Sequence, residues 1–106
     1  MKIHGIFRIG GGLALVAWAA VASAADLEAG KKLYDQLRCA RCHAINDQGG
    51  KTGPDLSHIG AVRDRKWLIQ FLKQPKSVIA DAKMMAVRAS DAELAALADY
   101  LASLKP

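Results

Sequence analysis

Apolar residues recur at helical spacing in three stretches of the chain. The first runs from Asp26 to Leu37, where the charged residues fall mostly on the face opposite the apolar ones. A glycine inside a helix costs about 1 kcal/mol relative to alanine. Gly30 therefore predicts that another helix approaches closely at this point. The positions that share the face are Leu27, Gly30, Tyr34 and Leu37.

Two further helices are predicted in the second half of the chain. Asp64 is a suitable N-cap for a short helix that ends at Pro75. Ser90 and Glu93 form a capping box for the C-terminal helix, whose apolar stripe includes Tyr100. The other apolar residues of the two helices are Trp67, Leu68, Phe71 and Leu72, then Leu94, Leu97, Ala98, Leu101 and Leu104.

The segments between these helices have the composition of loops. Residues 44–56 contain Gly49-Gly50 and Gly53-Pro54 and are predicted to be irregular. Residues 76–89 are predicted to form a loop with one helical turn at 77–81. After the N-terminal segment, no stretch alternates apolar and polar residues for long enough to indicate a strand, and no repeat occurs. The pattern therefore predicts an all-α domain.

The first 25 residues are predicted to be a cleaved secretory signal peptide. A basic start precedes an apolar run over 13–21, and Ala22-Ser23-Ala24 provides the small residues that a signal peptidase recognises. Cleavage is expected after Ala24 or Ala25. The alternative is a membrane anchor, but the uncharged stretch from Ile9 to Ala25 has 17 residues, at the short limit of the roughly 20 that cross a bilayer.

Residues 26–106 then form one domain of a size at which a cofactor or a crosslink is commonly needed for stability. Removing Lys2 and Arg8 with the signal lowers the net charge from +5 to +3. So small a charge points to neither nucleic acid nor an anionic membrane as a partner. No stable membrane insertion is expected after cleavage.

Cys39-Ala40-Arg41-Cys42-His43 carries the clearest chemistry in the chain. Two cysteines three positions apart, with a histidine after the second, form the attachment pattern of c-type haem: each thiol adds to a vinyl group and the imidazole ligates the iron. One covalently attached haem c is predicted, bound through Cys39 and Cys42, with His43 as the proximal ligand. A dithiol redox site and a zinc site are the alternatives, but no third cysteine and no thioredoxin-like strands accompany the pair.

Other residues are candidates for completing the surroundings of the iron. The Pro54 carbonyl could accept a hydrogen bond from His43 and so orient it, although Gly53-Pro54 could equally be only a turn. Opposite His43, Met84 or Met85 could supply a thioether, the standard partner of histidine in electron-carrying cytochromes. Methionine is also a common core filler.

Two aromatic side chains are further candidates for the same site. Trp67 is a possible haem contact through its indole N–H, or simply a core residue. His58 could ligate iron, but nothing in its surroundings places it opposite His43, and it is interpreted as a surface or structural residue.

In these residues and their spacing, the chain after the signal resembles the class I c-type cytochromes over nearly its whole length. In that family a glycine and an aromatic residue of the N-terminal helix contact a leucine and an aromatic residue of the C-terminal helix. The stretch 53–56, Gly-Pro-Asp-Leu, is similar to the family's Gly-Pro-x-Leu, which implies that Pro54 accepts from His43. The residues that fit the helix contact are Gly30, Tyr34, Leu97 and Tyr100.

Lys83-Met84-Met85 aligns with the family's Lys-Met-Pro, which implies Met84 as the distal ligand, while Met85 stands where proline is usual. The resemblance implies a small cytochrome c fold of three to five helices around one covalent haem, with the N- and C-terminal helices crossing. It also implies reversible one-electron transfer rather than conversion of a substrate, so the protein is not expected to be an enzyme.

The leading hypothesis is a periplasmic, monomeric monohaem carrier that passes single electrons between redox proteins. The alternatives are a haem sensor or peroxidase-like enzyme with an open distal site, and a dedicated electron-acceptor subunit of a periplasmic dehydrogenase. A basic rim could steer acidic partners. Its candidate members are Lys51, Arg63, Arg65, Lys66, Lys73, Lys76 and Lys83.

Overall fold

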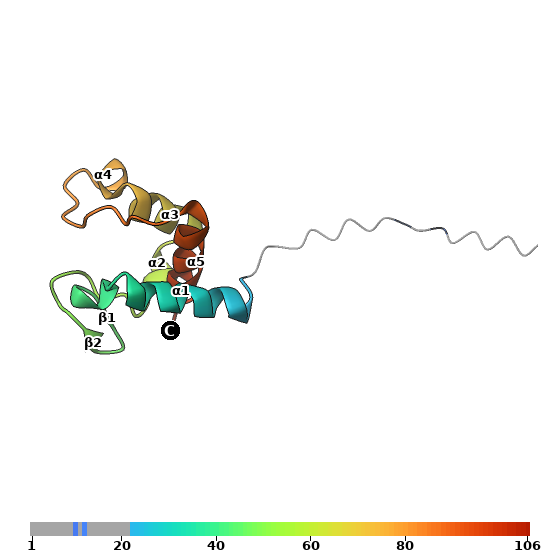
Figure 1. The fold of residues 1–106 in the computed structure, drawn as a ribbon, viewed down its shortest axis with the longest axis horizontal. Coiled ribbons are helices and arrows are strands. Elements are labelled where there is room, and N and C mark those ends of the chain that lie inside the picture. Colours follow the sequence, from blue (N-terminus) through green and yellow to red (C-terminus); the bar gives the residue numbers. More distant parts are fainter. Residues whose placement is uncertain (1–9, 11, 13–21) are drawn as a thin grey trace, which may run out of the picture.

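A computed structural model of the protein describes residues 22–106 together with Gly10 and Gly12 (Figure 1). The basic start and the apolar run of the predicted signal peptide lie outside the described residues, and the two glycines come between them in the sequence. Among the described residues, no helix has both the length and the apolar character needed to cross a membrane.

Helices α1 (Ala24–Gln36) and α5 (Asp91–Ala102) pack against each other, with α5 running across α1 (Figure 1). Gly30 is buried at their contact. A Cβ on Gly30 would lie 2.6 Å from the Tyr100 Cβ and would also overlap the Ala96 carbonyl. The rings of Tyr34 and Tyr100 meet edge to face with centroids 5.9 Å apart. The predicted close approach of a second helix at Gly30 is confirmed.

The two capping boxes explain where these helices begin. Ser23 and Asp26 cap α1, and Ser90 and Glu93 cap α5, in each case with the serine hydroxyl accepting from the N3 backbone N–H. The box on α5 was predicted. Helix α1 begins two residues earlier than predicted, so its N-cap lies inside the motif at which cleavage is expected.

Helix α3 (Arg65–Lys73) is capped by Asp64, whose side chain accepts from the Trp67 N–H at 2.8 Å, as predicted. The helical turn expected at 77–81 occurs earlier, as α4 (Pro75–Val78). Pro75 ends one helix and begins the next, because a proline has no N–H to donate to a preceding turn and its fixed φ suits a first helical position.

A short helix and a two-stranded hairpin were not predicted. Helix α2 (Ile59–Val62) is held by a hydrogen bond of 2.9 Å from the Gly60 N–H to the Leu104 carbonyl, a contact between distant parts of the chain. Strands β1 (Ala44–Ile45) and β2 (Gln48–Gly49) form an antiparallel hairpin. Strands of two residues are too short to leave an alternating pattern. The helical fold class is confirmed, with this small hairpin added.

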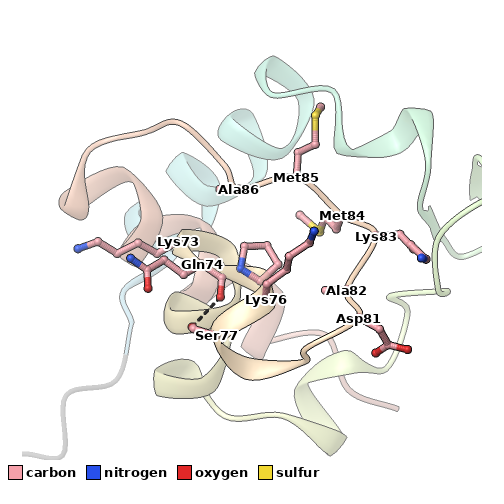
Figure 2. Close-up of a pocket in the computed structure, with 11 residues that line it drawn as sticks. Lys73, Gln74, Lys76, Ser77, Asp81, Ala82, Lys83, Met84, Met85 and Ala86 are labelled. Carbon is pink, nitrogen blue, oxygen red and sulfur yellow. Dashed lines mark hydrogen bonds between the residues drawn. The ribbon is translucent and has the colours of Figure 1, made fainter.

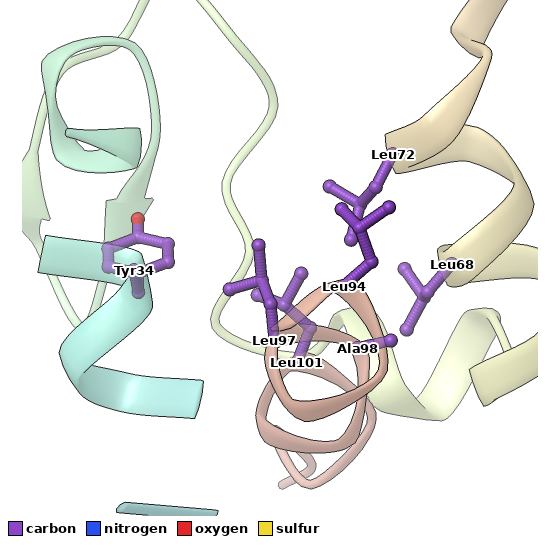
Figure 3. Close-up of a cluster of buried hydrophobic side chains, with 7 residues drawn as sticks. All are labelled: Tyr34, Leu68, Leu72, Leu94, Leu97, Ala98 and Leu101. Carbon is purple, nitrogen blue, oxygen red and sulfur yellow. The ribbon is translucent and has the colours of Figure 1, made fainter. Parts of the chain in front are cut away.

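The hydrophobic core lies where α5 packs between α1 and α3 (Figure 3). Leu97 and Ala98 are fully buried, and an ion pair of 2.6 Å between the Arg65 Nε and the Asp99 carboxylate also links α3 to α5. All the buried side chains of this cluster lie on α1, α3 and α5, and the described segments between these helices contribute none. Its buried members are Tyr34, Leu68, Leu72, Leu94, Leu97, Ala98 and Leu101.

Candidate haem-attachment site

The two cysteines lie on a single tight turn that follows α1. Arg38 follows the end of α1 and has a left-handed backbone (φ 58°). The next residues form the 3-10 helix η1 (Cys39–Arg41). The N–H groups of Cys42 and His43 both donate to the Cys39 carbonyl, at 3.1 and 3.0 Å. Both thiols and the imidazole therefore come from one compact turn.

Both cysteines are unpaired, and they differ in exposure. Cys39 is partly buried against the core, whereas Cys42 is exposed. Burial, with a smaller effect of the Asp35 charge, raises the pKa of the Cys39 thiol above its ordinary value. A dithiol redox site needs a thiol whose pKa is lowered. The environment of Cys39 thus argues against the redox alternative.

The zinc alternative needs further ligands near the cysteine pair. Within the part of the chain that the structure describes, no three His, Cys, Asp or Glu side chains gather in a metal-binding arrangement. His58 is exposed at the N-cap position of α2.

The imidazole of His43 is held by the loop that returns past it. Its Nδ1 lies 2.8 Å from the Pro54 carbonyl oxygen. A carbonyl can only accept, so the Nδ1 carries the proton and the Nε2 keeps a lone pair for a metal. A Cβ on Gly53 would lie 2.6 Å from the ring Cε1 of His43. Gly53 is therefore required for the close passage of the loop, a role beyond that of a turn residue.

Tyr34 reaches the same turn from α1. Its hydroxyl lies 3.5 Å from the His43 carbonyl, a long hydrogen bond. Burial, followed by nearby negative charge starting with Cys39, raises the pKa of Tyr34 to about 12, so the hydroxyl keeps its proton to donate. Sequence reasoning placed Tyr34 only at the helix contact. No spacing rule relates a residue of α1 to the carbonyl of a histidine nine positions later.

Met84 and Met85 lie in the extended loop between α4 and α5 and face different surroundings. Met84 is partly buried and packs against the core, whereas Met85 is 84% exposed. Both line a pocket of about 670 Å³ between α4 and the loop, and their side chains leave the loop in different directions (Figure 2). The loop is tied back to α3 by a hydrogen bond of 2.8 Å from the Val87 N–H to the Leu72 carbonyl.

Trp67 is partly buried in a stack on α3. Its ring is parallel to that of Phe71, with centroids 5.0 Å apart, and the Arg63 guanidinium lies 4.2 Å from the centre of the Trp67 ring. These two contacts already use part of the indole ring, and the contact of Trp67 with a haem stays a prediction.

The donor set fits a haem iron. It comprises two unpaired thiols on one turn, an imidazole whose Nε2 has no hydrogen-bond partner among the residues that the structure describes, and a thioether packed against the core. Imidazole and thioether are ligands that cytochromes use, and paired thiols one turn apart suit two vinyl groups. A small helical domain with this set is a c-type haem protein.

Comparison with known proteins agrees with this class. The family model for cytochrome c matches residues 27–105. Cytochrome c 2.1 of Caenorhabditis briggsae is 33% identical over 82 residues, a match covering 58% of this chain and 72% of that protein. Cytochrome c type-1 of Ascaris suum is 32% identical over 80 residues, covering 57% and 70%. No solved structure gave a significant match.

The chain belongs to the cytochrome c family. Members carry one covalently bound haem c per domain, and Cys39 and Cys42 fit the attachment motif. The family transfers electrons through this haem, and its members are electron carriers rather than enzymes.

Proposed function

We propose that the protein is an exported monohaem carrier that passes single electrons between redox proteins, with His43 and Met84 as the two axial ligands of the iron. The observation that carries the proposal is the hydrogen bond between the His43 Nδ1 and the Pro54 carbonyl. It fixes the tautomer in which Nε2 can bind a metal and raises the basicity of the ring.

Cys39 and Cys42 would hold the haem through two thioether bonds, and the bound haem supplies an iron that alternates between the ferric and ferrous states. A carrier works best when its ligands stay in place during this change. On the proximal side, two hydrogen bonds hold His43. Its backbone N–H donates to the Cys39 carbonyl, and its ring Nδ1 donates to the Pro54 carbonyl. A rigid ligand favours fast electron exchange because little has to reorganise.

Met84 is preferred over Met85 as the distal ligand because its side chain already packs against the core. Immobilising a free methionine side chain costs up to about 2 kcal/mol of rotamer entropy. Met85, 84% exposed, would have to meet that cost in full on binding iron. A thioether stabilises ferrous iron and raises the reduction potential, as suits a carrier.

The axial assignment is tested by comparing Met84→Ala with Met85→Ala in the haem-loaded protein. We expect Met84→Ala to lose the sulfur-to-iron charge-transfer absorption of the ferric form and, when reduced, to bind carbon monoxide rapidly. Met85→Ala should keep the absorption and resist carbon monoxide. If the two variants exchange these results, Met85 is the ligand. If the unmodified protein binds carbon monoxide rapidly, the site is open, as in a sensor or peroxidase.

Export to the periplasm and cleavage of residues 1–25 belong to the same proposal. Covalent haem attachment and an idle cysteine pair both fit an oxidising compartment, where a signal of this composition would direct the chain. Mass spectrometry of the haem-loaded protein from a periplasmic extract should give a chain that begins at Ala25 or Asp26. Recovery of the uncleaved chain in the membrane fraction would instead indicate an anchor.

The partners are proposed to be acidic redox proteins that bind briefly to a monomer. Lys73, Lys76 and Lys83 line the same pocket as both methionines, and of these the Lys73 Nζ is paired, at 3.0 Å from the Asp91 carboxylate. Reversing both charges, as Lys76→Glu with Lys83→Glu, should slow association with an acidic partner and flatten its salt dependence. Lys105→Glu, at an exposed position in the C-terminal tail, is the control. Equal effects of the two changes would contradict a local docking surface.

A further inference from the structure

Two segments on the proximal side are joined by four consecutive hydrogen bonds, which we call the His43 ladder. The Gly53 N–H donates to the Cys42 carbonyl at 2.7 Å, and the His43 Nδ1 donates to the Pro54 carbonyl at 2.8 Å. The Leu56 N–H then donates to the Ala44 carbonyl at 2.9 Å. The last bond runs from the Asn46 N–H to the Ser57 Oγ at 2.8 Å.

The last bond of the His43 ladder depends on the backbone conformation of the hairpin. Asn46 and Asp47 have left-handed backbones, with φ of 50° and 66°, and form the turn between β1 and β2. In this turn the Asn46 N–H has the Ser57 hydroxyl as its acceptor. The other backbone bonds of the ladder do not depend on side-chain identity, so Ser57 is the position where a substitution removes one bond and leaves the rest.

Ser57 also fixes the chain that carries the Pro54 carbonyl. Its backbone N–H donates to the Asp55 carboxylate at 2.8 Å, which closes a tight turn directly after Pro54. The Ser57 side chain and then its N–H lower the pKa of Asp55 below its ordinary value, with a smaller contribution from His58. Asp55 is thus charged over most of the pH range and keeps accepting from Ser57.

The direction of the Pro54 carbonyl follows from this turn, because the peptide group that contains it joins Pro54 to Asp55 and is planar. The His43 ring in turn follows the carbonyl to which it donates. We infer that Ser57, together with Asp55, is a positioning residue for the proximal histidine, and that it sets the orientation and basicity of the His43 imidazole and through them the reduction potential of the haem iron. This inference rests on the proposed role of His43 as the iron ligand.

The inference agrees with how such ligands are usually controlled. Partners that orient a metal-bound histidine typically change metal affinity or activity 10- to 100-fold when they are removed. Hydrogen bonding to the axial ligand is one of the levers that set a haem potential. Ser57 acts one step further out than the Pro54 carbonyl, so a smaller effect is expected than from loss of the carbonyl contact itself.

The experiment compares Ser57→Ala, Ser57→Thr and Ser103→Ala in the haem-loaded protein. Threonine keeps the hydroxyl, and Ser103 is an exposed serine whose hydroxyl donates to the Tyr100 backbone carbonyl at the end of α5. Asp55→Asn is added as a milder change in the same turn, in case Ser57→Ala lowers the yield of folded protein. Three quantities are measured: the reduction potential, the spread of the paramagnetically shifted haem methyl signals in the ferric form, and amide hydrogen exchange at Asn46.

We expect Ser57→Ala to lower the protection of the Asn46 amide about fivefold, the factor for one ordinary hydrogen bond. We also expect it to shift the potential and alter the methyl spread, which follows the plane of the axial imidazole. Ser57→Thr should restore all three, and Ser103→Ala should change none. Asp55→Asn should shift the potential in the same direction as Ser57→Ala.

Faster exchange at Asn46 with an unchanged potential and methyl spread would overturn the inference, since Ser57 would then only stabilise the loop. An equal shift in Ser103→Ala would overturn it as well. The sulfur-to-iron absorption of the unmodified protein is the separate check. If it is absent and no nitrogen ligand is detected on the iron, the proposed function fails and the inference fails with it.

Discussion

Different interactions hold two regions of the molecule together. One is the helical part, formed by α1, α3 and α5, and the other consists of the proximal loop, which carries His43, and the distal loop, which carries Met84. In the helical part, seven side chains are buried and interlock around α5. In the loops, Ala44 is the only buried hydrophobic residue among those described. The proximal loop is held by the His43 ladder instead. The distal loop, between α4 and α5, is held by the bond from the Val87 N–H to the Leu72 carbonyl and by the packing of Met84, Val87 and Ala89 against the core.

This difference separates stability from ligand control. Packed leucines contribute free energy in proportion to the apolar area that they bury, whereas exposed hydrogen bonds mainly fix directions and contribute little net free energy. We therefore expect the helical part to determine how stable the protein is and the loops to determine the properties of the iron. The covalent haem joins the two, because the loops have little buried surface of their own to keep them folded.

Replacing both attachment cysteines, as Cys39→Ala with Cys42→Ala, should have the largest effect. Without covalent haem, a domain of this size loses the cofactor that supplements its small core. We expect haem that is extractable by acidified solvent, loss of most of the cooperative unfolding transition, and loss of amide protection first in 42–57 and 76–89. Arg41→Ala, an exposed position between the cysteines, is the control. An unfolding midpoint equal to that of the unmodified protein would contradict the dependence on haem.

Leu97→Ala should have the next largest effect, and only on stability. Leu97 is fully buried at the centre of the core, and such truncations cost about 2–5 kcal/mol. Denaturant unfolding of the haem-loaded protein should show the loss, with the ferric spectrum unchanged under native conditions. Leu27→Ala, the same change at a partly buried position outside the core, should cost far less. A large change in the iron spectrum of Leu97→Ala would show that the two regions are not separable.

Gly30→Ala should destabilise the protein although alanine is the better helix former. The new methyl group would meet the Tyr100 Cβ at 2.6 Å and the Ala96 carbonyl. Overpacking costs about 1–3 kcal/mol, and the gain in helix propensity offsets about 1 kcal/mol of it. We expect a net loss of up to about 2 kcal/mol in the free energy of unfolding. Lys31→Ala, at an exposed position, should be nearly neutral. Stabilisation by Gly30→Ala would mean that α1 and α5 can separate at little cost.

The features that could be predicted from the sequence are those that depend on neighbours along the chain. Asp64 and Ser90 are N-caps, and with them the first residues of α3 and α5 follow from hydrogen bonds between residues three positions apart. Gly30 was informative for a related reason: its cost in an isolated helix is known, so a compensating contact could be expected.

The features that could not be predicted depend on contacts between distant segments. Helix α2 forms because Gly60 bonds to Leu104, and the His43 ladder ends on a hydroxyl 11 residues from Asn46. Neither contact leaves a periodic or compositional mark. The Pro54 carbonyl could be named in advance only because a metal-bound histidine needs an acceptor and a family resemblance pointed to one.

The smallest effect on stability is expected at the capping box of α5, where the distal loop ends. Hydrogen bonds from the Ser90 N–H and then its hydroxyl lower the pKa of Glu93 below its ordinary value of 4.5. Because the folded pKa lies below the unfolded one, this contribution is complete above pH 4.5 and is lost as the pH falls through the lowered value. Glu93→Gln keeps an acceptor for the cap but does not titrate.

We therefore expect the stability difference between the unmodified protein and Glu93→Gln to be constant above the ordinary pKa of a glutamate carboxyl and to shrink below it. Chemical unfolding of both proteins at each pH measures the difference, and the protonation of groups that the two proteins share cancels in the comparison. The ferric spectra of the two proteins should agree at every pH, because the cap belongs to the helical part and not to the distal loop. A difference that grows on acidification would mean that the Glu93 carboxylate is not held by Ser90 in solution.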